Sequence, residues 1–345
     1  MFFKCKKCNK TWQYPIEKCP ECFSLLEKIK PGDSKVVGIS KVTTPTLLHP
    51  SVPYFTLVLE DDKGNRWVQK SSQEYQIGQE FKKDILINEG AVSICRIKYD
   101  FREAMEETIC LLGGVALDGN SKVLVLPTLE APTHPYFRDN TSPQFLEAVF
   151  EILSDKGVKP ENIRTGGQSF GEMPIEDIAQ KSQILESCQK FKIMPFDLSK
   201  GVFIKKENNG FNFEIADEAL KSDLVISLAA LKIGKTSASD NILKLLKKEN
   251  YLGLKYLHTR KEIKDNLAKI MPKILSLGEA NSVQKCNKLT TFLGVSLASF
   301  KADNLDRVFG EIVSSVPDEI KELKIESIPV SGRTIEELKY EADKF

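Results

Sequence analysis

The pattern of apolar and polar positions divides the chain into three parts. Residues 1–30 are basic and rich in cysteine, and they are too few to form a hydrophobic core of their own. In residues 31–99, short apolar runs alternate with turn signals, which is typical of a small β domain such as the oligonucleotide/oligosaccharide-binding (OB) barrel. The predicted strands of this part are 35–44, 54–60, 66–70 and 92–98.

From residue 100 to residue 345, apolar runs of strand length alternate with segments of helical periodicity. This alternation predicts an α/β domain with a mostly parallel sheet covered by helices on both faces. The predicted helices are 101–112, 143–155, 175–191, 240–248, 260–271, 304–314 and 335–342. The predicted strands are 122–126, 163–165, 193–196, 223–228, 292–297 and 324–329.

Length and charge limit the possible classes of function. The chain has 345 residues, of which 41% are apolar, so we expect more than one packed domain. The 49 Lys and Arg residues nearly cancel the 48 Asp and Glu residues, so no overall field attracts nucleic acid or anionic lipid. The apolar runs are far shorter than the roughly 20 residues of a transmembrane helix. Without a signal-peptide pattern at the N-terminus, we expect a cytoplasmic protein with no membrane partner.

Two Cys-x-x-Cys pairs near the N-terminus predict a metal site. Cys5 and Cys8 are separated by ten residues from Cys19 and Cys22, which is the spacing of a zinc ribbon. Four sulfur ligands leave no open coordination position, so the ion is expected to hold the fold. One structural zinc ion is the predicted cofactor, and iron in the same four-sulfur cage, as in a redox protein, is the alternative.

The N-terminal part resembles a known family. The motifs are the cysteine pairs with 19–22 (CPEC), 36–40 (VVGIS), 53–55 (PYF) and 77–81 (IGQEF). They resemble the family of domain of unknown function 35, although Asn9 and Phe23 stand where that ribbon usually has glycine. The resemblance implies a rubredoxin-like zinc ribbon joined to an OB-like barrel, and association with acyl-coenzyme A (acyl-CoA) metabolism, often as a partner of thiolase-like enzymes. Nucleic acid is the alternative partner, but the barrel segment lacks the required positive charge.

The remaining part resembles the family of domain of unknown function 362. The motifs are 123–127 (VLVLP), 142–149 (SPQFLEAV), 222–227 (SDLVIS), 231–232 (LK), 293–298 (LGVSLA) and 330–338 (VSGRTIEEL). Members often carry an iron–sulfur segment and a histidine shortly after the lysine that matches Lys232. Neither feature is present in this sequence, so no iron–sulfur cluster is expected. The resemblance therefore implies a fold more than a reaction.

Three segments that follow predicted strands are candidates for a ligand site. Ligands of parallel α/β sheets bind at the carboxyl ends of the strands, where loops and helix N-termini converge. The segments are 127–140, 166–171 and 232–239, and the residues expected to bind are His134, Arg138, Gly166, Gly167, Lys232, Lys235 and Thr236. Cationic side chains and glycine backbone amides predict an anion-binding pocket. Connection geometry for the glycines and a solvated surface for the lysines are the simpler alternatives.

The sequence thus predicts a zinc ribbon and an OB-like barrel fused to an α/β domain. We expect a zinc-binding accessory protein or enzyme that handles acyl-CoA or another anionic small molecule. The pattern does not distinguish a catalyst from a scaffold. A nucleic-acid-binding protein and an iron redox protein are the alternative functions.

Overall fold

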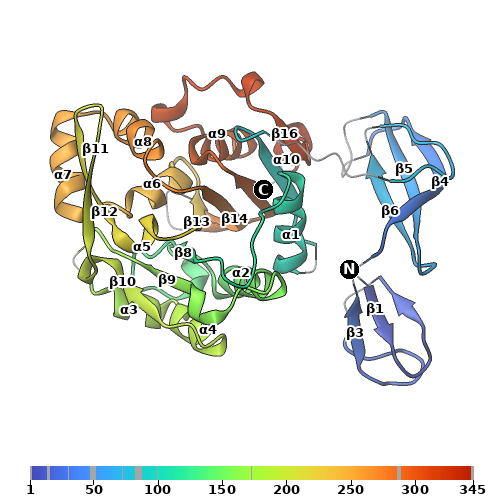
Figure 1. The fold of residues 1–345 in the computed structure, drawn as a ribbon. Coiled ribbons are helices and arrows are strands. Elements are labelled where there is room, and N and C mark those ends of the chain that lie inside the picture. Colours follow the sequence, from blue (N-terminus) through green and yellow to red (C-terminus); the bar gives the residue numbers. More distant parts are fainter. Residues whose placement is uncertain are drawn as a thin grey trace. The chain divides into compact units, whose positions relative to one another are not determined.

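The computed structural model of the chain contains two compact units, Met1–Asp84 and Ile85–Phe345. Each unit is described by itself below (Figure 1). In the described residues, no helix is long and apolar enough to cross a bilayer. The structure describes residues 2–13, 16–29, 31–46, 52–71, 73–81, 88–98, 100–171, 173–285 and 289–342.

The first unit consists of two small antiparallel sheets. In the first sheet, β1 (Phe2–Cys5) lies between β2 (Thr11–Trp12) and β3 (Leu26–Ile29). The second sheet has the order β4 (Ser34–Val42), β5 (Tyr54–Asp61) and β6 (Arg66–Ser71). Every second residue of β5 is buried, as expected for a strand with one face on a core. The predicted strands at 35–44, 54–60 and 66–70 are therefore confirmed.

The second unit is built on one eight-stranded sheet of order β10-β9-β8-β13-β14-β15-β7-β16. Neighbouring strands from β10 to β14 are parallel, β14-β15 and β15-β7 are antiparallel, and β7-β16 is parallel. The strands are β7 (Val92–Arg96), β8 (Val123–Pro127), β9 (Ile163–Gly167), β10 (Pro195–Asp197), β13 (Leu224–Lys232), β14 (Ile274–Gln284), β15 (Thr290–Ser299) and β16 (Val330–Gly332). The predicted α/β fold with a mostly parallel sheet is confirmed.

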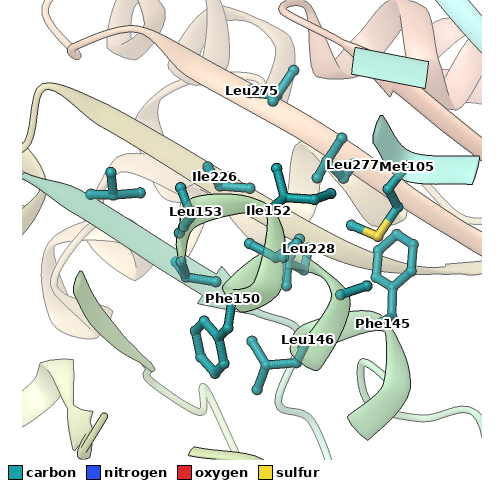
Figure 2. Close-up of a cluster of buried hydrophobic side chains, with 14 of the residues drawn as sticks. Met105, Phe145, Leu146, Phe150, Ile152, Leu153, Ile226, Leu228, Leu275 and Leu277 are labelled. Carbon is teal, nitrogen blue, oxygen red and sulfur yellow. The ribbon is translucent and has the colours of Figure 1, made fainter. Parts of the chain in front are cut away.

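Helices cover both faces of this sheet (Figure 1). They are α1 (Phe101–Leu111), α2 (Pro143–Asp155), α3 (Ile175–Lys181), α4 (Ile184–Lys190), α5 (Asp217–Leu220), α6 (Ser237–Leu243), α7 (Lys248–Leu257), α8 (Arg260–Ala268), α9 (Ala302–Ile312) and α10 (Ile335–Ala342). Side chains of α1 and α2 pack on the sheet in one cluster: Ile152 and Leu153 lie near Ile226 of β13, and Met105 and Phe145 lie together on the side of Leu277 of β14 (Figure 2). Residues of α9 and α10 pack on the other side of the sheet's antiparallel part.

Several predicted elements are wrong or incomplete. The strand predicted at 92–98 in the small β domain pairs instead with β15 and β16 in the large sheet. The helix predicted at 175–191 is two helices, because Gln183 has a left-handed backbone (φ 61°) between them. Residues 324–329 form a 3-10 turn and irregular chain rather than a strand, since the pairing segment is β16. The hairpin of β11 (Phe203–Asn208) and β12 (Phe211–Ala216) and helix α7 were not predicted.

Candidate metal centre and ligand site

The four predicted cysteine ligands lie on two similar turns. In the first turn, the Asn9 amide donates to the Cys5 carbonyl, and the Cys5 amide donates to the Lys10 carbonyl. In the second turn, Phe23 and Cys19 repeat these two bonds, with Ser24 in the place of Lys10. Each Cys-x-x-Cys pair therefore closes on itself through the backbone, and its two sulfurs point to the same side.

The four sulfurs form one cluster that fits a metal ion. All four Sγ atoms lie within 4.8 Å of one another, with Cys5–Cys22 at 3.3 Å and Cys8–Cys19 at 3.4 Å. Tetrahedral zinc with Zn–S bonds of about 2.3 Å needs sulfur separations of about 3.8 Å. A hydrogen bond of 3.5 Å joins Cys22 Sγ and Ser24 Oγ, and this contact is the first cause of a Cys22 pKa lowered to about 6. The cluster thus has the ligands and spacing of a closed four-sulfur site.

Phe23 makes the second turn strained. Its backbone is left-handed (φ 56°), which costs a bulky residue about 1–3 kcal/mol, and its side chain is 76% exposed. Because Phe23→Gly removes the strain with little loss of burial, we expect it to stabilise the metal-bound ribbon by about 1 kcal/mol. Titration with a chelator measures this effect: the chelator concentration that removes half of the metal should be higher for Phe23→Gly than for the wild type. Asn9→Gly is the control with a smaller effect, since asparagine tolerates this conformation, and a lower midpoint for Phe23→Gly contradicts the prediction.

The three predicted ligand segments meet at one edge of the large sheet. They follow β9, β8 and β13, which are neighbouring parallel strands. Their carboxyl ends therefore lie side by side, as a ligand site at this edge requires. Helix α6 follows β13 and ends just before Lys244, which lies at the same edge of the sheet. There Gln168, the residue after β9, donates two hydrogen bonds of 2.6 Å, one to the carbonyl of Lys244 and one to the carbonyl of Leu246.

Two buried lysines converge on one carboxylate at this edge. Lys232, at the end of β13, donates to Glu130 Oε2 at 2.5 Å and to the Asp139 carbonyl at 3.0 Å. Lys244 Nζ lies 3.8 Å from Glu130 Oε1, and in the described residues it has no hydrogen-bond partner. Lys232 is 3% exposed and Lys244 is 9% exposed, whereas Lys235 is at the surface.

Burial and charge act against each other in this cluster. Burial lowers the pKa of Lys244 and the charge of Lys232 lowers it further, while Glu130 opposes both. Burial acts to raise the pKa of Glu130, but the charges of Lys244 and Lys232 outweigh it and hold that pKa below its ordinary value. Glu130 is therefore a carboxylate at neutral pH. Two lysines thus share this one carboxylate, and Lys235 also acts on it.

The glycine-rich segment has a different local role from the one predicted. Gly166 and Gly167 are the last residues of β9 rather than part of a loop. A Cβ atom on Gly166 would lie 2.1 Å from the Phe196 carbonyl oxygen in β10, so close strand packing explains this glycine. The amide of Gly171 donates to the hydroxyl of Ser169. These contacts position Gln168 and the strand end.

Three other predicted ligand residues are occupied with contacts inside the fold. The Tyr136 amide donates to Nδ1 of His134, so this exposed histidine caps a 3-10 turn. Arg138 forms an ion pair of 3.2 Å with Glu279, a carboxylate that is 2% exposed. Thr236 is buried and donates to Asp240. Only Lys232 and Lys235, among the predicted cationic side chains, lie at the cluster around Glu130.

A buried carboxylate holds the start of α6. Asp306 of α9 accepts hydrogen bonds from the amides of Ala238 and Ser239 and from the Ser239 hydroxyl, at 2.8–2.9 Å. It is 1% exposed, and burial raises its pKa to about 7 against the effect of these bonds. Because the folded pKa exceeds the unfolded one, this group stabilises the fold below about pH 4, and that stabilisation is lost as the pH rises through 7.

We therefore expect the contribution of Asp306 to the free energy of unfolding to fall between pH 5 and pH 8, by about 2–3 kcal/mol. Denaturant unfolding of the wild type and of Asp306→Ala at both pH values measures it. Asp306→Ala is expected to be less stable, and the gap to the wild type is expected to narrow at pH 8. An equal gap at the two pH values contradicts the assignment.

A cavity of about 420 Å³ lies at the ends of β9 and β10. Apolar residues such as Leu129, Ile175 and Phe196 form part of its wall. Its charged residues are Arg164, Lys200, Glu176, Asp197, Asp217 and Glu218, so carboxylates outnumber cations. The cavity has room for the body of a small molecule, but it supplies no excess positive charge.

Sequence reasoning missed Lys244, Gln168 and Glu279. Lys244 lies within the predicted helix 240–248, where a lysine is usually solvated. Gln168 lies in the glycine-rich segment 166–171, where the glycines give the stronger signal, and Glu279 lies in β14, which the pattern does not predict. Their roles depend on which strands become neighbours, and one sequence gives no signal for that.

A family model agrees with the resemblance predicted for the second part of the chain. The family model of the domain of unknown function DUF362 matches residues 123–239, which include β8, β9, β13 and the start of α6. A solved structure, the Ltp2-ChsH2(DUF35) aldolase, has a chain with 23% identity and a TM-score of 0.20. That match covers 23% of this chain and 67% of the other. No curated protein matches the sequence.

Proposed function

We propose that this protein binds one structural zinc ion at its four-cysteine centre and an anionic small molecule at the carboxyl ends of β9, β8 and β13. The observation that carries the second part is the convergence of Lys232 and Lys244 on Glu130. Both lysines are almost fully buried, and Lys235 adds positive charge at the rim. Buried cations without enough counter-charge are costly unless they bind a ligand.

Lys244 supports a ligand most directly. An ammonium group has three donors, and in the described part of the chain no acceptor is within hydrogen-bond distance of this one. A phosphate or carboxylate group placed between Lys244 and Lys232 accepts from both. The binding energy then comes from charge-assisted hydrogen bonds in a site with little access to water.

The positive charge of the site and the family resemblance support the chemical class that we propose for the ligand. We propose acyl-CoA, or another small molecule with a phosphate group, as the ligand, with its organic part in the cavity at the ends of β9 and β10, whose wall includes Leu129, next to Glu130 in the sequence. We also propose that the small antiparallel sheets of the first unit form an OB-like module and that a thiolase-like or other acyl-CoA enzyme is the partner. We propose zinc rather than iron because two Cys-x-x-Cys pairs at this spacing are typical of structural zinc ribbons.

The variant Lys244→Met tests the ligand site. Methionine keeps the length and apolar stem of the side chain but removes the buried charge. We expect coenzyme A and inorganic phosphate to bind about 10- to 100-fold more weakly, the loss of about 1.5–3 kcal/mol for a charged hydrogen bond. The thermal midpoint is expected to rise, because a buried ammonium without a hydrogen bond is replaced by an apolar group. Isothermal titration calorimetry and thermal unfolding of the zinc-loaded chain measure both.

Lys247→Met is the matched control. Lys247 lies three residues further along, its side chain is 46% exposed, and it pairs with Glu214 outside the cluster. Its loss should leave phosphate binding unchanged. If Lys244→Met binds phosphate as well as the wild type does, or if the wild type binds neither phosphate nor coenzyme A, the proposed ligand site is wrong.

A further inference from the structure

We infer that the carboxylate of Glu130 occupies the place of the ligand's anionic group, so that Glu130 is a built-in competitor that selects for doubly charged phosphate groups. This inference rests on the proposed ligand site. It adds that a side chain of the protein itself fills the anion position when no ligand is bound. It assigns Glu130 as a specificity-determining residue.

The geometry shows that one carboxylate fills this place incompletely. Glu130 Oε2 accepts from Lys232 at 2.5 Å, but Oε1 is 3.8 Å from Lys244 Nζ, which is beyond hydrogen-bond distance. Two oxygens on a planar group thus satisfy one lysine and leave the other without a bond. A tetrahedral phosphate presents three free oxygens in different directions, so it can accept from both lysines at once.

Exposure shows which of the three groups can leave. The side chain of Glu130 is 43% exposed, so its carboxylate can turn into water and be solvated there. Lys232 and Lys244 are almost fully buried and remain where they are. The exchange therefore moves one flexible side chain and leaves the cationic pair in place.

The backbone that carries Glu130 is held independently of its carboxylate. The amides of Glu130 and Ala131 donate to Oδ1 of Asn140, and the Asn140 amide group donates back to the Ala131 carbonyl. Lys232 also keeps its bond to the Asp139 carbonyl. The loop is thus expected to keep its shape when the side chain of Glu130 turns away.

The other carboxylate nearby does not take the place of Glu130. The two oxygens of Asp139 accept from the Thr133 hydroxyl at 3.0 Å and from the Gln284 amide at 2.9 Å. Only Glu130, among the described carboxylates, forms ion pairs with Lys232 and Lys244. Because the competitor carries one negative charge, a dianionic phosphate is expected to displace it more readily than a monoanionic carboxylate does.

The variant Glu130→Gln tests the inference. Glutamine keeps the size of the side chain and an oxygen that accepts from Lys232, but it removes the negative charge. Calorimetric titration of the zinc-loaded full chain with inorganic phosphate is expected to show binding about tenfold tighter than in the wild type, or more. Acetate should gain as much or more, so the preference of the wild type for phosphate is expected to shrink. Glu130→Asp has a shorter side chain, which moves the carboxylate away from the lysines. It should also bind phosphate more tightly than the wild type does, but the gain should be smaller than for Glu130→Gln.

The control variant and the possible results separate the role of Glu130 from the existence of the ligand site. Glu326→Gln removes an exposed carboxylate outside the cluster and should leave phosphate affinity unchanged. If the wild type binds phosphate but Glu130→Gln and Glu130→Asp bind it equally well or more weakly, Glu130 is not a competitor, and the proposed ligand site still stands. If neither the wild type nor Glu130→Gln binds phosphate or coenzyme A, the proposed site and the inference fall together.

Discussion

Replacement of Cys19 by Ser is expected to release the metal ion and to unfold the ribbon of the first unit. Cys19 is fully buried and belongs to the four-sulfur cluster. The ribbon has only a small three-stranded sheet, so its folding depends on metal binding, which contributes on the order of 10 kcal/mol in small zinc domains. Elemental mass spectrometry of the wild type should find one zinc ion per chain, and the variant should have lost most of it.

The expected damage is confined to the first unit. The large sheet has its own core, so its unfolding transition should stay at the same temperature in Cys19→Ser. Cys110→Ser is the control, because Cys110 lies in α1 and outside the cluster. A wild type that contains iron supports the redox alternative, and one that contains no metal contradicts the metal centre.

Replacement of Arg138 by Met is expected to destabilise the second unit by about 3–5 kcal/mol, the cost of leaving a buried carboxylate without its ion pair. Glu279 is 2% exposed, and among the described residues Ser142, whose amide donates to it at 2.9 Å, is the hydrogen-bond partner that remains after this change. Burial raises the pKa of Glu279, and Arg138 opposes that rise. The variant should therefore recover part of its stability at pH 5, where Glu279 takes up a proton more easily.

Denaturant unfolding at pH 5 and pH 8 measures this effect. The double variant Arg138→Met with Glu279→Gln should recover most of the loss at pH 8, because no buried charge remains. Arg164→Met is the control for a surface pair: Arg164 and Glu218 have side chains that are 55% and 35% exposed, and their pair contributes at most about 1 kcal/mol. If Arg138→Met lowers the free energy of unfolding by only about 1 kcal/mol, as expected for a surface pair, Glu279 is not a buried carboxylate that depends on Arg138.

The sequence predicted the parts of the fold whose signals are local. Strands such as β8 and β13 are continuous apolar runs, and Ser142 begins α2 by capping it, with its hydroxyl accepting from the Phe145 amide. The spacing of the four cysteines likewise predicted the metal centre, because two tight turns between paired ligands form within a few residues. Local chemistry sufficed in these cases.

Strand order could not be predicted in the same way. The β-rich composition of residues 92–98 gives no sign that this segment pairs with β15, about 200 residues away in the sequence. Pairing over such a distance depends on how the apolar faces of α1, α9 and the sheet fit together. The short strand β16 was missed for the same reason, since only its position beside β7 makes it a strand.

The ligand site shows the same division between local and tertiary information. The sequence by itself determined that 127–140 and 232–239 follow buried strands and carry polar side chains, because strand ends and polar loops have local signatures. Only the tertiary structure decided that Lys232 and Lys244 are buried around Glu130 while Arg138 turns to Glu279. Burial and ion pairing depend on neighbours from other strands and helices, and a side chain's charge at one position does not specify which neighbours it meets.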